Sequence, residues 1–395
     1  MLSQRQLFFE HMGLPSLNPL GIEIKTARGV FLYGPDGKDY IDLVSGVTVS
    51  NLGHQHPDII QAIKDQADKH LHVMVYGDLI QAPQVRLAEK LTSLLPENLQ
   101  SVYFVTSGSE AIDGALKLAK RYTGRTGIIS FRNSYHGGTH GALSICGNEQ
   151  LKYAFRPLLP DVKILNFNNE DELKCITTST ACVVVETIQA EAGIILPEHD
   201  FLKKLRNRCN ETGSLLIIDD IQMGMGRTGK LFSFEHFGIV PDIICLAKAF
   251  GGGMPLGAFI SSKEIMRSFT HDPELGHITT FGGHPVSCAA ALASLEFITS
   301  NEVYKYADNK ADIFISILSG HKKIKSIRHK GLMIGIDLES SEMTGKLIRH
   351  FADHGIIADS FLFRPQAFRI APPLIINEEE IHLACDRLIS SLDLA

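Results

Sequence analysis

The sequence lacks the patterns that define several classes of protein. Its purely apolar runs are short, such as residues 182–185 and 215–218, far below the roughly 18 to 20 residues that span a bilayer. Residues 1–13 show no basic start followed by an apolar core, so no secretory signal is expected. The formal charge of −6 comes from 38 basic and 44 acidic residues without a Lys/Arg block. We therefore expect neither nucleic acid nor a membrane as a partner.

Paired cysteine motifs are also missing. The seven cysteines are odd in number and include no CxxC pair, which is typical of reduced thiols in a cytoplasmic chain. No group of His, Cys and Asp residues has the spacing of a zinc site, so no metal is predicted. We expect a cytoplasmic protein.

The chain does contain a regular alternation of strand-like and helix-like segments. A length of 395 residues, with 44% hydrophobic and 21% charged residues, suggests two or three packed globular units. Continuous apolar runs predict strands buried on both faces, at residues 102–105, 127–131, 183–186, 215–219, 243–246 and 258–260. Helical patterns lie between them, for example at residues 110–122 and 201–212. This order predicts an α/β fold with a mostly parallel sheet.

The two ends of the chain have a different pattern. A hairpin meander is expected at residues 22–26, 30–33 and 40–43, and an α+β pattern follows residue 304, with strands at 332–338 and 368–370. We predict a large α/β domain at residues 51–298 and a smaller α+β domain built from residues 1–50 and 299–395.

The segment Thr106 to Glu110 follows one predicted strand and opens a helix. A helix N-terminus offers free N–H groups, and Gly108 lets a ligand approach closely, so Ser107, Gly108 and Ser109 could seat a phosphate. The alternative is a capping box between Ser107 and Glu110 that needs no ligand.

Two further strands end in chemically active side chains. Asp219 and Asp220 end the strand at 215–219, where ligands of open α/β sheets bind, although such acids can also simply face solvent. Lys248 follows the strand at 243–246 and precedes three glycines. Low-polarity surroundings would lower the pKa of its amine and make it a nucleophile toward carbonyl groups. A Walker A loop is excluded, because there the glycines precede the lysine.

Pyridoxal 5′-phosphate (PLP) is a cofactor that requires these three features together. It needs a Schiff-base lysine, an acidic partner for its ring nitrogen and an anion seat. Tyr135 could stack on its ring, or could be an ordinary loop aromatic.

At these residues the chain resembles the class III, or omega, aminotransferases of fold type I, from about residue 18 to residue 377. The resemblance includes the acetylornithine, ornithine and 4-aminobutyrate aminotransferases. The segments that carry it are 41–46 with 52–57, 106–110, 186–193, 219–229 (DDIQMGMGRTG), 247–257, 279–285 and 368–373.

The resemblance implies a role for each matching residue. Lys248 would hold the cofactor and move the proton, Asp219 would pair with the ring nitrogen, and Gln222 would contact the ring hydroxyl. Arg369 would grip a substrate carboxylate, and Glu191 would pair with it when an amine donor is bound. A structural ion pair is the alternative for these two. Thr280 would reach the phosphate of a partner subunit, which implies a homodimer with sites at the interface, or else is only a turn hydroxyl.

The sequence departs from the family at a few positions. Gly138 stands where ornithine and acetylornithine members carry an arginine, which puts those substrates in doubt. Arg132 or Arg364 could replace the missing charge, or could lie at the surface. Other departures are Asp220 for glutamate, Ala190 and Ala192 for glycines, and His284 for asparagine, which we expect to change the shape of the pocket.

The leading hypothesis is a PLP-dependent aminotransferase that moves an amino group, expected to be a terminal one, to a 2-oxo acid by a ping-pong mechanism. An aminomutase or amino-acid racemase on the same fold is the alternative, and a non-catalytic protein that keeps the fold is a third hypothesis. The presence of Arg369 and Glu191 favours the first, and the intact Lys248 and Asp219 argue against the third.

Overall fold

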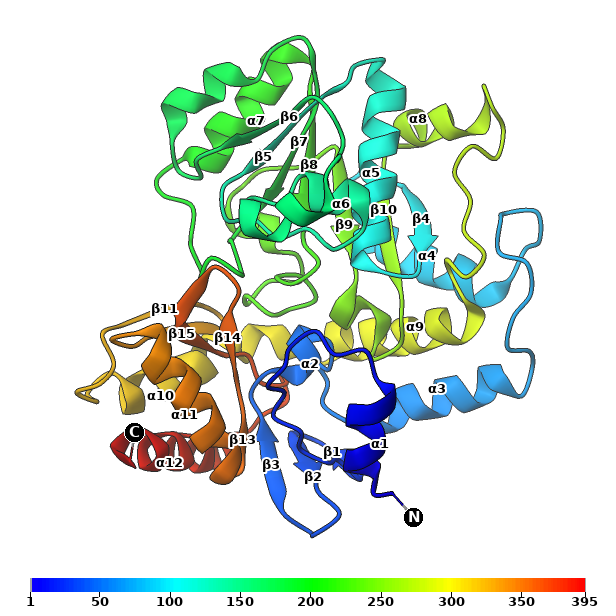
Figure 1. Cartoon of the computed structure of the whole chain (residues 1–395). Coiled ribbons are helices and arrows are strands. Elements are labelled where there is room, and N and C mark those ends of the chain that lie inside the picture. The colour runs from blue at the N-terminus through cyan, green and yellow to red at the C-terminus, as the bar shows by residue number, and fades with distance from the viewer. Residues whose placement is uncertain (1, 395) are drawn as a thin grey trace.

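A seven-stranded sheet forms the centre of the molecule, which the computed structural model describes for residues 2–394 (Figure 1). Its order is β4-β10-β9-β8-β7-β5-β6. The strands are β4 Ser101–Val105, β5 Gly127–Phe131, β6 Val162–Leu165, β7 Thr180–Glu186, β8 Leu215–Asp219, β9 Ile243–Leu246 and β10 Gly257–Ser261. Strands β6, β5, β7, β8 and β9 are parallel, whereas β10 is antiparallel to both β4 and β9. The prediction of a mostly parallel central sheet is confirmed.

Both faces of this sheet are buried, which explains why its strands are continuously apolar. In β7, Val183 and Val185 belong to one core cluster, while Cys182 and Val184 belong to another on the opposite face. The first face is covered by α3 Pro57–Ala67, α4 Ala82–Leu94, α7 Phe201–Thr212 and α9 Pro285–Ser300. The second is covered by α5 Gly108–Thr123, α6 His140–Ser144 and α8 Lys263–Met266.

Elements from the two ends of the chain lie together on one side of the central sheet (Figure 1). Strand β13 (Ile356–Ile357) pairs in parallel with β3 (Asp39–Asp42), so one small sheet contains both ends, in the order β1-β2-β3-β13. A second has the order β11-β12-β15-β14. The remaining strands are β1 Thr26–Arg28, β2 Phe31–Tyr33, β11 Ser326–Lys330, β12 Met333–Asp337, β14 Asp359–Phe361 and β15 Arg364–Ile370. The domain limits at residues 50 and 298 stay a prediction.

The remaining helices complete the described part of the chain. The α-helices are α1 Gln4–His11, α2 Ser45–Thr48, α10 Ala307–Leu318, α11 Ser341–Asp353 and α12 Glu378–Leu394. The 3₁₀ helices are η1 Glu149–Leu151, η2 Tyr153–Phe155, η3 Glu170–Cys175, η4 Ser233–His236, η5 Lys248–Gly251, η6 Arg267–Thr270 and η7 Val303–Tyr306.

Local strand predictions failed in several places, among them the following two. The strand expected at residues 22–26 is wrong, because β1 begins only at Thr26, and the side chain of Ile24 is 42% exposed and gains little from burial. Strand β6 was not predicted, because Lys163 interrupts its apolar residues at the edge of the sheet.

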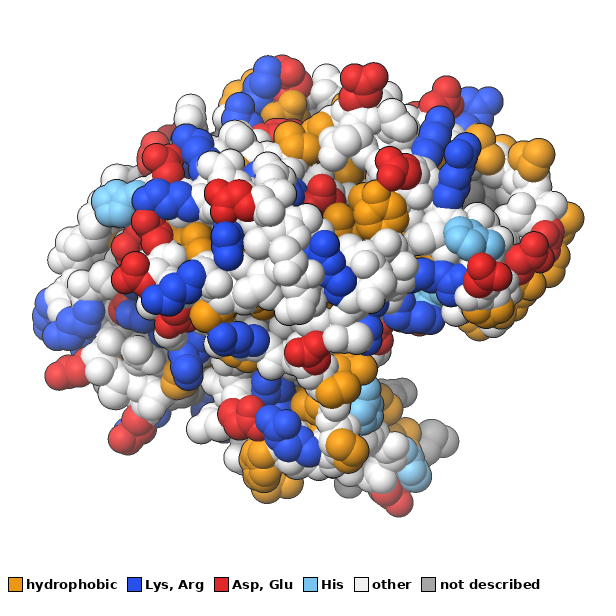
Figure 2. Space-filling view, turned by 90° about the horizontal axis from the view of Figure 1, so that it is seen from above, with side chains coloured by type: hydrophobic (Ala, Val, Ile, Leu, Met, Phe, Trp, Pro, Cys, Tyr) orange, Lys and Arg blue, Asp and Glu red, His pale blue; other side chains and the backbone are white. Residues whose placement is uncertain are grey.

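The surface shows charges of both signs. Figure 2 shows Lys and Arg side chains interspersed with Asp and Glu over the face seen from above. Between residues 2 and 394, no helix is both long and apolar enough to cross a membrane.

Candidate active site

A cavity of about 450 Å³ lies at the carboxyl ends of the central strands, where ligands of open α/β sheets bind. The loops and turns after β4, β5, β8 and β9 line it, together with the end of β7. It brings together seven of the predicted residues: Ser107, Gly108, Ser109, Tyr135, Asp219, Gln222 and Lys248.

The N-terminus of α5 forms one wall of the cavity. Ser107 is its N-cap, and its Oγ accepts a hydrogen bond from the Glu110 N–H at 3.2 Å. In a capping box the Glu110 carboxylate would accept from the N–H of Ser107. Here it accepts instead from the N–H of the preceding residue, Thr106, at 2.7 Å. A Cβ on Gly108 would lie only 2.9 Å from Ile221 Cδ1, so any larger residue here would force the Ile221 side chain to shift.

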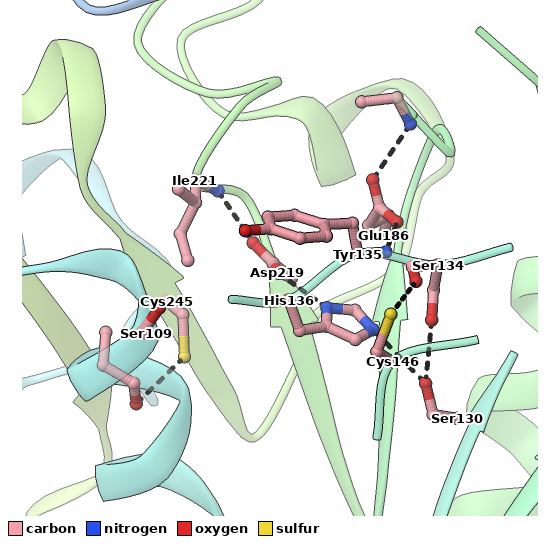
Figure 3. Close-up of polar contacts among 12 residues, drawn as sticks. Ser109, Ser130, Ser134, Tyr135, His136, Cys146, Glu186, Asp219, Ile221 and Cys245 are labelled. Atoms are coloured by element: carbon pink, nitrogen blue, oxygen red, sulfur yellow. Dashed lines mark hydrogen bonds and ion pairs between the residues drawn. The ribbon is translucent and has the colours of Figure 1, made fainter. Parts of the chain in front are cut away.

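Asp219 is fixed by two hydrogen bonds at the end of β8 (Figure 3). Its Oδ2 lies 2.7 Å from Nδ1 of the buried His136, and its Oδ1 accepts from the Ile221 N–H at 3.1 Å. The other ring nitrogen of His136 lies 3.3 Å from Ser130 Oγ. A carboxylate can only accept, so Nδ1 donates to Asp219, and His136 orients that carboxylate. The sequence analysis missed His136, although it directly follows Tyr135.

Lys248 follows β9 in a backbone conformation that is unusual for a lysine, with φ of 52°. Such conformations cost energy and occur preferentially at functional sites. Burial lowers the pKa of its amine, an effect that the carboxylates of Glu191 and Asp219 partly oppose. The amine therefore loses its proton more readily than an exposed lysine does, as a nucleophile requires.

Glu186 is a buried acid at the end of β7 that the sequence analysis did not assign. Its carboxylate accepts hydrogen bonds from the N–H groups of Tyr135 at 3.1 Å and Ala190 at 2.9 Å (Figure 3). Burial raises the pKa of Glu186 to about 7. Glu186 thus anchors the loop that carries Tyr135.

Arg369 and Glu191 form a buried ion pair, with Arg369 Nη1 lying 2.9 Å from Glu191 Oε1. Neither residue lines the cavity itself, but both charges act on the pKa of Lys248. Asp359 is a second carboxylate partner, and its two oxygens accept from Arg369 Nε at 3.0 Å and Nη2 at 3.1 Å. Nothing in the sequence pattern marked Asp359.

Several other predicted residues lie outside the cavity. Thr280 is exposed on a loop and does not line the cavity of its own chain. Asp220 is buried against Ser233, whose N–H donates to it at 3.0 Å. Arg364 donates to Asp337 at 2.6 and 2.9 Å, and the exposed Arg132 donates to Asn166 at 3.0 Å, which favours structural or surface roles for both arginines.

The lining of the cavity fits PLP. Gln222 Nε2 is buried and has no hydrogen-bond partner among residues 2–394, so it is a donor available to a bound group. A Cβ on Gly137 would lie 2.1 Å from Ser109 Oγ, so this turn can pack closely against the α5 N-terminus only with glycine. The same cavity holds an amine, a carboxylate and a helix N-terminus, which are the groups that PLP requires. Within the described part of the chain, no cluster of three or more His, Cys, Asp or Glu side chains could hold a metal ion.

Fold and site together define a fold type I, PLP-dependent transaminase. The family model described as Aminotransferase class-III matches residues 14–392, and the chain belongs to this family. It is an aminotransferase, and PLP is its cofactor.

Named relatives support this assignment over nearly the whole chain. The acetylornithine aminotransferase of Methanocaldococcus jannaschii is 38% identical over 95% of this chain and 93% of its own. A [LysW]-aminoadipate semialdehyde/glutamate semialdehyde transaminase of Sulfurisphaera tokodaii is 37% identical over 80% of this chain and 82% of its own. Among solved structures, an amine transaminase from an uncultivated Pseudomonas species in the PLP-bound form superposes with a TM-score of 0.89 at 26% identity, over 97% of this chain and 98% of that one.

Proposed function

We propose that this aminotransferase moves a terminal amino group from an amine donor to a 2-oxo acid such as 2-oxoglutarate, in two half-reactions at one site. The observation that carries this proposal is the buried pair of Arg369 and Glu191 close to Lys248. An arginine alone would select carboxylate substrates in both half-reactions. An arginine with a removable carboxylate partner can serve one substrate with a carboxylate and one without.

Each residue of the cavity has a proposed part in holding the cofactor. PLP supplies an electrophilic aldehyde and a ring that accepts electrons from the reacting carbon. Asp219, held by His136, keeps the ring nitrogen protonated, and Gln222 donates to the ring hydroxyl. The N-terminus of α5, with Ser107, Gly108 and Ser109, binds the phosphate, while Tyr135 stacks on the ring.

Lys248 holds the aldehyde group and then moves the proton at the substrate carbon that bears the amino group. Its lowered pKa leaves a neutral amine that can accept this proton. Arg369 binds the carboxylate of the 2-oxo acid when Glu191 moves aside. Glu191 returns to Arg369 when the donor is bound, so that the buried cation is not left unpaired.

The proposed assembly is a homodimer in which Thr280 reaches the partner's cofactor. A groove of about 340 Å³ beside Thr280 is lined largely by apolar residues, including Leu79, Ile80 and Val85. Ile80 is 93% exposed and Phe281 is 55% exposed. Exposing such apolar surface to water is unfavourable, and a second copy of the chain would bury it. Light scattering after size-exclusion chromatography should give twice the mass of the 43.5 kDa chain.

We also propose a cytoplasmic location, supported by seven free cysteines.

The experiment that tests the proposed reaction is a donor screen with 2-oxoglutarate, scored by glutamate formation. Terminal amines such as ω-amino acids, N-acetylornithine and diamines should give glutamate, and donors that offer only an α-amino group should react more slowly. Conversion of a donor into its own isomer without any oxo acid would favour the aminomutase or racemase alternative. No glutamate from any terminal amine would contradict the proposal.

A further inference from the structure

Arg369 has a carboxylate directly opposite it on the neighbouring strand. In the antiparallel pairing of β14 with β15, Asp359 is the register partner of Arg369. Side chains of directly opposed residues lie close together, and here both oxygens of Asp359 bind the Nε and Nη2 edge of the guanidinium. Strand pairing therefore places the two residues opposite each other, and neither of them lies on a flexible loop.

Three groups together surround the guanidinium. Asp359 occupies its Nε edge, Glu191 binds Nη1, and the Phe361 ring lies against it with 4.9 Å between Arg369 Cζ and the ring centroid. A guanidinium has five N–H donors, and these two carboxylates use three of them. If only Glu191 leaves, the outer Nη1 and Nη2 hydrogens remain available as a fork for a substrate carboxylate.

Glu191 is the partner that is easier to remove. Its other oxygen accepts from the N–H of Leu362 at 3.1 Å, and its backbone carbonyl accepts from the N–H of Phe363 at 3.0 Å. Removal of either side chain breaks two hydrogen bonds, but Glu191 holds Arg369 by only one bond from a turn, whereas Asp359 holds it by two bonds from the opposite strand of a paired hairpin. Asp359 is therefore the partner that we expect to stay on Arg369 in both half-reactions.

The net charge around Arg369 depends on whether Glu191 is in place. With Glu191 in place, one cation faces two carboxylates, so the group carries a net charge of −1. With Glu191 displaced, Arg369 and Asp359 together are neutral, and an incoming carboxylate meets a neutral pair and not a free cation. We propose that Asp359 determines substrate specificity, by weakening the hold of Arg369 on the carboxylate of the 2-oxo acid and thereby favouring amine donors that lack a carboxylate at this position.

This inference rests on the proposed role of Arg369, and the test separates the two. The holoenzyme would be titrated by calorimetry with glutarate, an unreactive dicarboxylate, and its KM for 2-oxoglutarate and for the best donor of the screen would be measured. Asp359→Asn keeps the shape of the side chain and removes its charge. We expect the Kd for glutarate and the KM for 2-oxoglutarate to fall roughly 3- to 10-fold, while the donor KM stays the same or rises.

Control variants make each result decisive. Asp359→Glu keeps the charge and should resemble the wild type, and Asp359→Ser removes the charge in a second way if the asparagine variant does not fold. Asp39→Asn removes the charge of an aspartate in β3, on another sheet, that pairs with Arg387 of α12, and it should leave every constant unchanged. An unchanged or higher Kd for glutarate in both charge-removing variants would overturn the inference.

Arg369→Lys tests the underlying function. If it raises the KM for 2-oxoglutarate and the Asp359 variants do not lower it, only the inference fails. If Arg369→Lys leaves that KM unchanged, Arg369 does not bind the oxo acid and the proposed function fails with it.

Discussion

Two arginines are almost completely buried in this protein, and their surroundings are opposite in kind. Arg227 is fully buried and donates to neutral oxygens, the backbone carbonyls of Leu332 and Pro372 and the side chain of Asn51. Arg369 is 2% exposed and is bound by the carboxylates of Glu191 and Asp359.

The pKa values of the two arginines shift in opposite directions. Burial lowers the pKa of Arg227 to about 9, and the Asp42 carboxylate, which does not bond to it, only partly opposes this effect. Burial would also lower the pKa of Arg369, but Glu191 and Asp359 outweigh it and raise that pKa above its usual value. Backbone carbonyl partners are fixed in place, so Arg227 holds three segments of the chain together. A carboxylate partner, in contrast, can be exchanged for the carboxylate of a substrate. We therefore interpret Arg227 as structural and Arg369 as functional.

The largest effect is expected at Lys248. Its charge helps to lower the pKa of Glu191, the partner of Arg369, whereas it does not contribute to the pKa shift of Arg227. Lys248→Ala removes both the group proposed to hold the cofactor and the base proposed to move the proton. Turnover should fall by roughly 10³-fold or more, measured as glutamate formation at saturating substrates. The exposed Lys230, in the segment that follows β8, provides a matched control, and Lys230→Ala should keep full activity. Substantial turnover by Lys248→Ala would contradict its proposed role.

Arg227→Met tests the structural half of the comparison. It leaves three buried oxygens without their donor, so the free energy of unfolding should fall by about 3 to 5 kcal/mol. Denaturant unfolding measures this loss, and the KM for 2-oxoglutarate should stay within about twofold of the wild type at a temperature where the variant is folded. A large change in KM with little loss of stability would show that Arg227 belongs to the site.

The same comparison shows what the sequence could predict. Lys248, Asp219 and the α5 N-terminus each follow directly on an apolar strand, and the carboxyl ends of parallel strands meet at one edge of the sheet. Their convergence on one cavity follows from the fold class alone. Arg369 and Glu191 could be proposed only from the resemblance to a family, because 178 residues separate them in the chain.

Other contacts left no local signal in the sequence. The hydrogen bond between His136 and Asp219 spans 83 residues, and the pairing of Asp359 with Arg369 depends on the register of a hairpin whose first strand was not predicted. Arg227 lies in the motif at residues 219–229, but its partners at 51, 332 and 372 come from segments whose packing only the structure reveals.

Glu186 is the acidic counterpart of Arg227, because its partners are the neutral N–H groups of Tyr135 and Ala190. Its pKa rises from 4.5 to about 7 on burial, so the folded protein binds this proton more tightly than the unfolded chain does. Its contribution to stability is therefore fully present below pH 4.5 and is lost as the pH rises through about 7.

Glu186→Gln removes this titration, and the readout is the change of stability with pH. The stability of the wild type relative to the variant should fall between pH 4.5 and pH 7, by up to about 3 kcal/mol. The free energy of unfolding is measured with denaturant at several pH values for both proteins. The altered hydrogen bonds change it by the same amount at every pH, so they do not affect the comparison of its slope against pH. A difference that does not vary with pH would mean that folding does not raise the pKa of Glu186.

The smallest effect is expected at Gly138, where the resemblance implies an arginine in members that act on ornithine and acetylornithine. A Cβ at Gly138 would meet no atom within 4 Å, and the residue is exposed, so both Gly138→Ala and Gly138→Arg should fold with stability within about 0.5 kcal/mol of the wild type. An exposed ion pair contributes up to about 1 kcal/mol, so the new arginine should lower the KM for N-acetylornithine by at most about fivefold relative to Gly138→Ala. A much larger fall would mean that a bound substrate shields this position from water as thoroughly as the protein shields Arg369. The rule drawn from the two buried arginines, that burial decides how much a charge contributes, would then extend to position 138, next to Gly137 of the cavity lining.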